Sequence, residues 1–160
     1  LHAELVFLID LRSDDFYWTG KSYPTTSQQN GLVRISNLKT HFFDFNIGNI
    51  MVLGCHDLVM FNPRSKNAKN WREQVNKNFK ELANIMHPIC VLHHPHTTVK
   101  RRTWLNAWNY LIKKFPSVKY YIGAGRYYES DRDQSEWDSL DIVLSSTKRG
   151  SSIDFVVWKD

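Results

Sequence analysis

The sequence is poor in cysteine, and the two it contains form neither a C-x-x-C pair nor a loop framework. Cys55 and Cys90 lie in or beside short apolar runs, so we expect free thiols in a reducing compartment, the cytoplasm. No apolar run reaches 18 residues, which excludes a membrane-spanning helix. A signal peptide, an internal repeat and a low-complexity segment are also absent from the sequence. These absences point away from secreted and membrane-embedded classes of protein.

The chain has 160 residues, which is enough for one domain and too few for two ordinary ones. Its hydrophobic content of 42% argues against disorder. A net charge of +5 favours anionic partners such as nucleic acid, nucleotides or phosphate esters. The chain begins at Leu1 rather than methionine. We therefore expect a single α/β domain spanning residues 1–160, as a trimmed protein or as a fragment whose site a further domain or partner chain completes.

Apolar runs and helical periodicity alternate along the chain. Strands are predicted at 4–10, 32–35, 41–45, 49–57, 89–93, 118–123 and 153–158, and helices at 68–86, 101–115 and about 136–144. The segment 11–30 is predicted to be a long loop, and 41–57 a strand pair with a turn at 46–48. Strands that alternate with helices indicate β-α-β crossovers. We predict an α/β fold with a central, mostly parallel sheet flanked by helices, similar to a three-layer sandwich.

The most distinctive segment is 89–98, an apolar run that ends in His93, His94 and His96. Ligands and metals bind where the parallel strands of α/β sheets end. If the strands are parallel, Asp10, the 55–57 segment, the histidine segment and the 125–126 pair all reach the same edge of the sheet. The pattern therefore predicts one site assembled from four strand ends.

Imidazole and carboxylate groups are suitable ligands for Zn, Mn or Fe. A divalent metal ion there could generate a hydroxide that attacks a phosphoryl or acyl centre. We predict metal binding by Asp10, His93, His94 and His96, and catalytic roles for His56, Asp57 and Arg126. In this hypothesis Arg126, on a glycine-flanked turn, clamps an anionic group. The alternative for each is structural: a histidine that hydrogen-bonds within the fold, or an aspartate that caps a turn.

Two clusters of basic residues are candidates for binding anions. Arg101 and Arg102 lie at the start of a predicted helix, where positive charge opposes the helix dipole. Lys148 and Arg149 lie in a serine-rich loop that could hold phosphate. In the alternative interpretation, both clusters are simply solvated.

The order of these strand ends resembles that of calcineurin-like metallophosphoesterases. The segment Gly54-Cys55-His56-Asp57 is similar to the family's G-N-H-D element, and Leu92-His93-His94-Pro95 to its single-histidine strand. The resemblance implies that His56 is the transition-state acid and that His93 or His94 binds metal. The sequence departs from the family pattern where Arg12 replaces a histidine and where the last G-H-x-H motif lacks both histidines. The resemblance then implies one metal ion, or a relative that binds a phosphate ligand without cleaving it.

Four functions remain open from the sequence. The first is a metal-dependent hydrolase of phosphate esters, such as a nuclease, with a divalent metal ion as cofactor. The second is a non-catalytic α/β module that binds nucleotide or nucleic acid through basic loops. In the third, Cys55 is a nucleophile with a strand-end histidine as its base. In the fourth, the chain is an interaction domain whose histidines are structural. Whether the protein is an enzyme stays undecided at this stage.

Overall fold

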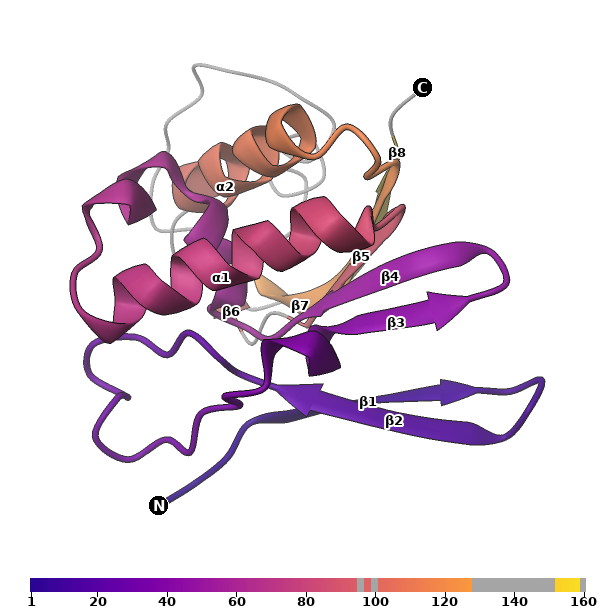
Figure 1. Cartoon of the computed structure of the whole chain (residues 1–160), viewed down its shortest axis with the longest axis horizontal. Helices are drawn as coiled ribbons and strands as arrows, with labels where there is room; N and C mark the ends of the chain where they lie inside the picture. The colour runs from indigo at the N-terminus through magenta and orange to yellow at the C-terminus, as the bar shows by residue number, and fades with distance from the viewer. Residues whose placement is uncertain (95–96, 99–100, 128–151, 159–160) are drawn as a thin grey trace.

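The computed structural model describes residues 1–94, 97–98, 101–127 and 152–158. A mixed sheet forms the centre of this part of the chain, with the strand order β3-β4-β5-β7 and with β8 and β6 also paired to β7. Two helices cover one face of the sheet, and a separate hairpin, β1-β2, lies against the other (Figure 1). The predicted α/β class is confirmed at this level.

The bounds of the elements follow the chain in order. The strands are β1 (Leu5–Asp10), β2 (Asp15–Gly20), β3 (Phe42–Phe45), β4 (Gly48–Leu53), β5 (Cys90–His93), β6 (Thr97–Thr98), β7 (Tyr120–Tyr127) and β8 (Ser152–Trp158). The α-helices are α1 (Trp71–Met86) and α2 (Arg101–Lys114), and the 3₁₀ helices are η1 (Leu38–His41), η2 (Asp57–Phe61) and η3 (Pro63–Asn67). Neither described α-helix has the length and apolarity to cross a membrane. The helix predicted at 136–144 lies outside the described residues.

The centre of the sheet is parallel, and both flanking strands are antiparallel. Strands β4, β5 and β7 run in the same direction, whereas β3 pairs antiparallel with β4 and β8 antiparallel with β7. Along the chain, β5 is added next to β4, and β7 is added next to β5 on the side away from β4. Right-handed crossovers then place α1 and α2 on the same face. Helices on both faces are therefore not confirmed for the described part of the chain.

The N-terminal region differs most from the prediction. The segment 11–30 was expected to be a loop, but residues 15–20 of it form β2, which pairs with β1. The strand expected at 32–35 is wrong, because Leu32 forms only an isolated bridge to His2. Strand β1 is a strand as predicted, but its side chains alternate between exposed and half-buried positions instead of being buried. Strand β1 belongs to a hairpin that is apolar on both faces. A continuous apolar run is expected for such a strand as well as for a buried one, so the sequence alone does not distinguish them.

The β3-β4 hairpin was predicted and is present. Its turn places Gly48 at a φ of 116°, a conformation that favours glycine. A Cβ atom at this position would also lie 3.0 Å from the side chain of Ile89. This turn therefore requires glycine for both backbone and steric reasons.

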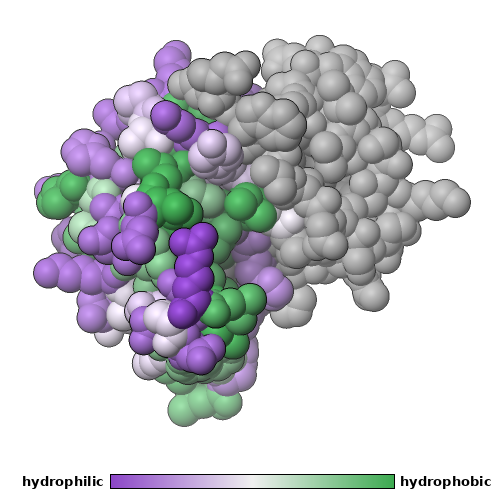
Figure 2. Space-filling model, turned by 90° about the vertical axis from the view of Figure 1, so that its right-hand side faces the viewer, coloured by the Kyte–Doolittle hydropathy of each residue, from purple (hydrophilic) through white to green (hydrophobic). Residues whose placement is uncertain are grey.

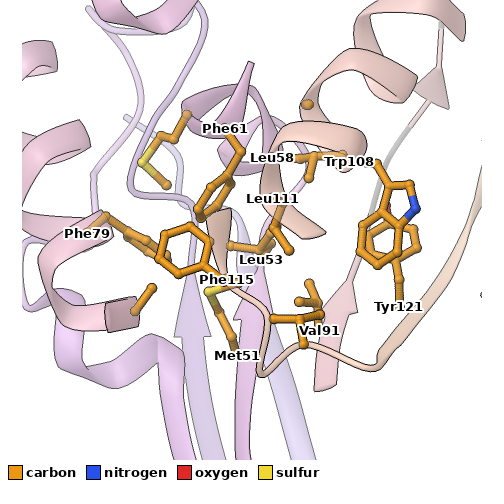
Figure 3. Packing of buried hydrophobic residues seen from close by; sticks show 14 of the residues in the cluster. Met51, Leu53, Leu58, Phe61, Phe79, Val91, Trp108, Leu111, Phe115 and Tyr121 are labelled. Carbon is orange, nitrogen blue, oxygen red and sulfur yellow. The ribbon is translucent and has the colours of Figure 1, made fainter. Parts of the chain in front are cut away.

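The main core fills the space between the sheet and the two helices. Met51 and Leu53 of β4 face it, while Ile50 and Val52 of the same strand face the hairpin. Figure 3 shows the aromatic side chains that close this core around Leu53. Phe79 of α1 is fully buried, and its ring lies 5.0 to 6.0 Å from the rings of His41, Phe42 and Phe61.

We expect Phe79→Ala to lower the free energy of unfolding by about 3–5 kcal/mol, because it leaves a cavity between α1 and the sheet. Ile85→Ala on the same helix is the matched control, since Ile85 is 70% exposed, and it should change stability by no more than ~0.5 kcal/mol. Urea unfolding followed by circular dichroism measures both values. A similar small loss in the two variants would contradict this description of the core.

Candidate functional site

The histidine segment and the 55–57 segment lie side by side. Strands β4 and β5 are parallel neighbours, with Leu53 paired to His93 at their carboxyl ends. The backbone N–H of His94 donates to the carbonyl of Leu53 at 3.0 Å. The ring Nε2 of His93 lies 3.2 Å from the carbonyl oxygen of Cys55. Two of the four predicted strand ends therefore meet at one edge of the sheet.

Asp10 does not join them. It ends β1 at the tip of the hairpin, where it lines an open cavity of about 630 Å³ together with Asp44 of β3 and Ile47 of the β3-β4 turn. Strand β4 begins at this turn, so the cavity lies at the opposite end of that strand from Cys55. Asp10 is elsewhere because β1 belongs to the hairpin and not to the parallel sheet.

His93 is buried and uses both ring nitrogens within the fold. A carbonyl oxygen can only accept, so Nε2 carries the proton that is donated to Cys55, and Nδ1 accepts from the hydroxyl of Tyr121. Its ring also packs 5.2 Å from that of Trp104. Burial lowers the pKa of His93 to about 4, so the imidazole is neutral at pH 7. In this arrangement neither nitrogen has a lone pair directed toward a metal ion.

Asp57 is completely buried and accepts three backbone hydrogen bonds. One oxygen accepts from the N–H groups of Ser22 and Tyr23 at 3.1 and 2.7 Å, and the other from Gly54 at 3.0 Å. Burial raises the pKa of the carboxyl, while nearby His41 and the backbone donors act in the opposite direction. The side chain therefore connects the segment after β2 to the end of β4, which is the structural role that a turn-capping aspartate would have.

Ser22, His41 and Asp57 do not form a nucleophilic triad, although all three residue types are present. His41 donates from Nδ1 to the carbonyl of Val52 at 2.7 Å, and its Nε2 lies 2.7 Å from the hydroxyl of Ser22. Asp57 contacts the backbone of Ser22 and not the imidazole. Since Ser22 and His41 are buried as well, the network supports the fold.

At this edge the half-buried ring of His56 lies beside two residues that the sequence did not single out, the buried Tyr23 and the half-buried Arg72. The His56 ring stacks on Tyr23 with a centroid distance of 6.3 Å and an interplanar angle of 12°. The guanidinium of Arg72 lies 3.9 Å from the centre of the Tyr23 ring and donates to the carbonyl of Pro24 at 2.5 Å. Arg72 is therefore held in one place by a cation–π contact and a hydrogen bond.

The electrostatic environment of His56 is positive. Its pKa is lowered to about 4, mainly by burial and also by the charges of Arg72 and Lys21, while the charge of Glu4 acts in the opposite direction. The ammonium of Lys21 is buried and is paired with Glu4 at 2.5 Å. A neutral imidazole in a positive potential is suited to donate its ring N–H to an anionic ligand, or to lie beside one.

The two thiols differ in environment. Neither cysteine forms a disulfide, as predicted. Cys55 is partly exposed and borders a small cavity of about 130 Å³ together with Glu4 and His94. Cys90 is buried on the hairpin side of the sheet, and burial raises the pKa of its thiol to about 11. Only Cys55 lies where a ligand at the strand ends can reach it.

The remaining predicted residues are described in backbone only, or not at all. Arg126 was expected on a turn but lies within β7, where it is paired with Thr97 of β6. Strand β7 continues through the glycines because β8 pairs with it along 120–126. Arg101 and Arg102 begin α2 as expected. His96, Lys148 and Arg149 lie outside the described residues.

The described donors do not fit a metal centre. Within the parts of the chain that the structure describes, no group of three or more His, Cys, Asp or Glu side chains could hold a metal ion. Two of the predicted residues, His93 and Asp57, already use their nitrogen and oxygen atoms in hydrogen bonds within the protein. No protein-family model matches the chain. A comparison with curated proteins also found no match.

Asp57→Asn tests the structural role of the buried carboxylate. The new amide would direct its NH₂ group at a backbone N–H, so we expect a loss of about 2–4 kcal/mol in the free energy of unfolding. Asp44→Asn, at an exposed position of β3, is the control and should stay within ~0.5 kcal/mol of wild type. Thermal and urea unfolding provide the measurement, and equal stability of the two variants would argue against the role.

His93 should make stability depend on pH. Its pKa is lower in the folded protein than in the unfolded chain, so the unfolded chain binds the proton more tightly and acid favours unfolding. Its contribution is complete above pH 6.5 and is lost as the pH falls toward 4. We expect wild type to lose about 2 kcal/mol more than His93→Gln between pH 7 and pH 5.

Urea unfolding at pH 7, 6 and 5 measures this difference. His2→Gln, at an exposed position, is the control and should retain the wild-type pH dependence. A pH dependence that is unchanged in His93→Gln would mean that His93 is not buried in its neutral form.

Proposed function

We propose that this protein binds a phosphate-containing ligand, a nucleotide or nucleic acid, at the carboxyl ends of β4 and β5. The site is formed by Tyr23, Cys55, His56, Arg72 and His94, and we call it the strand-end site. The observation that carries the proposal is the guanidinium of Arg72, which is fixed on the Tyr23 ring beside a neutral His56.

The geometry supports an anionic ligand for three reasons. Arg72 uses one of its terminal amino groups on the Pro24 carbonyl, and a guanidinium has five N–H donors in a planar fork that matches phosphate oxygens. Little side-chain entropy is lost on binding, because the contacts with Tyr23 and Pro24 already hold the group in place. The net charge of +5 adds a long-range attraction.

Metal-dependent hydrolysis of a phosphate ester, the most specific hypothesis raised by the sequence, stays a prediction.

 The resemblance to calcineurin-like metallophosphoesterases favours it, since Gly54-Cys55-His56-Asp57 follows a strand as the family's G-N-H-D element does. The described residues offer it no donor set. Ligand binding without cleavage, which the resemblance also implies, is therefore the better-supported function.

Binding should depend on Arg72 and weaken with salt. We expect Arg72→Gln to reduce affinity for a single-stranded oligonucleotide or for inorganic phosphate by roughly 10-fold or more, because a charge-assisted hydrogen bond is lost. Lys77→Gln is the control on the same helix, since Lys77 is exposed and paired only weakly with Glu81 at 4.0 Å. Fluorescence anisotropy at two salt concentrations measures oligonucleotide binding, and calorimetry measures phosphate binding.

The pKa of His56 offers an independent measurement on the same samples. A bound phosphate anion should raise it from about 4 toward its ordinary value, which NMR titration of the ring protons detects. Equal affinities of Arg72→Gln and Lys77→Gln, with an unchanged His56 pKa, would refute the proposal. A gain in melting temperature with Mn²⁺ or Zn²⁺, reversed by chelator, would instead support the metal-dependent alternative.

A further inference from the structure

The β1-β2 hairpin has an apolar outer face. Side chains in a strand alternate, and those of β1 and β2 that point away from the sheet are large and hydrophobic. We call them the hairpin face: Leu5, Phe7, Ile9, Phe16 and Trp18. Their exposed fractions range from 42% for Leu5 to 58% for Phe16. Hydrophobic side chains reach the surface at the lower end of the view in Figure 2, where Figure 1 places the hairpin.

The face is continuous because the residues are cross-strand neighbours. Phe7 is paired with Trp18 and Ile9 with Phe16, and the rings of Phe7 and Phe16 stack with centroids 5.3 Å apart. The inner face of the same hairpin is already used, since Val6 and Leu8 pack against the sheet. The hairpin thus has one apolar face inside the fold and a second one toward solvent. A contiguous apolar patch of this kind marks an interaction site.

We propose that the hairpin face is the contact surface of a homodimer, in which it packs against the same face of a second copy. Together the five side chains expose on the order of 500 Å² of apolar surface, and the hairpin backbone and rim add to this, against about 800 Å² per partner in a standard interface. A two-fold axis through the patch would bring the two Phe7-Trp18 pairs together, and a face without charge has no like-charge repulsion with its own copy.

Charge at the hairpin tip argues against two other occupants. Asp10, Asp14 and Asp15 lie in the turn segment 10–15, in which Arg12 is the one basic residue. This local negative charge disfavours an anionic lipid surface and a nucleic acid, although exposed aromatic residues would otherwise suit both. A second hairpin face is apolar and brings no phosphate groups. The proposal is independent of the strand-end site.

Sedimentation equilibrium of the wild-type chain tests the proposal. We expect a dimer at roughly 100 μM protein. This concentration exceeds the micromolar dissociation constants of the weakest interfaces of standard size. The double variant Phe7→Thr/Trp18→Thr retains strand-forming residues but removes the central aromatic pair. It should raise the dissociation constant by roughly 100-fold or more.

Ile85→Thr is the matched control, because Ile85 is 70% exposed on α1, away from the hairpin, and its substitution should leave the dimer unchanged. If the first double variant does not fold, as judged by circular dichroism, Ile9→Thr/Phe16→Thr takes its place. A monomeric wild type at this concentration overturns the proposal, as does a dimer that persists in the folded double variant.

Discussion

The arrangement of the strand ends depends on the three backbone hydrogen bonds that Asp57 accepts. They connect the segment that follows the hairpin, at Ser22 and Tyr23, to Gly54 at the end of β4. The Tyr23 ring in turn makes a cation–π contact with the guanidinium of Arg72 and stacks with the ring of His56. If the carboxylate were lost, the strand end and the ring on which the guanidinium rests would no longer be held in register. A buried carboxylate that accepts three backbone hydrogen bonds thus holds these segments together.

Two histidines lie at the strand ends in different environments. His93 lies inside, with both nitrogens hydrogen-bonded, and contributes to stability in its neutral form. His56 lies outside it, partly exposed, in the field of Arg72 and Lys21. Burial is the largest cause of the low pKa of both histidines. The charges of Arg72 and Lys21 lower the pKa of His56 further, and the charge of His94 lowers that of His93. A perturbed pKa alone would not have separated the two roles.

Strands β4 of the sheet and β1 of the hairpin are similarly apolar but differ in how much of their surface is buried. Strand β4 directs one set of apolar side chains to the helices and another to the hairpin, so both of its faces are buried. Strand β1 has a similar apolar composition but only one covered face among the described residues. The continuous apolar run predicted a strand correctly in both cases. Its burial was wrong for β1, because burial depends on which layers are stacked above and below.

By itself the sequence determined the local elements: the helical stripe around Phe79, the turn at Gly48, and the adjacency of Cys55 and His93, which follows from consecutive strands joined by a helix. These depend on periodicity and short connections, which are local properties of the chain. Only the tertiary structure decided that Asp10 lies at the far end of β4, that His93 is saturated, and that Arg72 and Tyr23 meet beside His56. Those facts depend on how the hairpin and the helices pack against the sheet, and no local pattern encodes that packing.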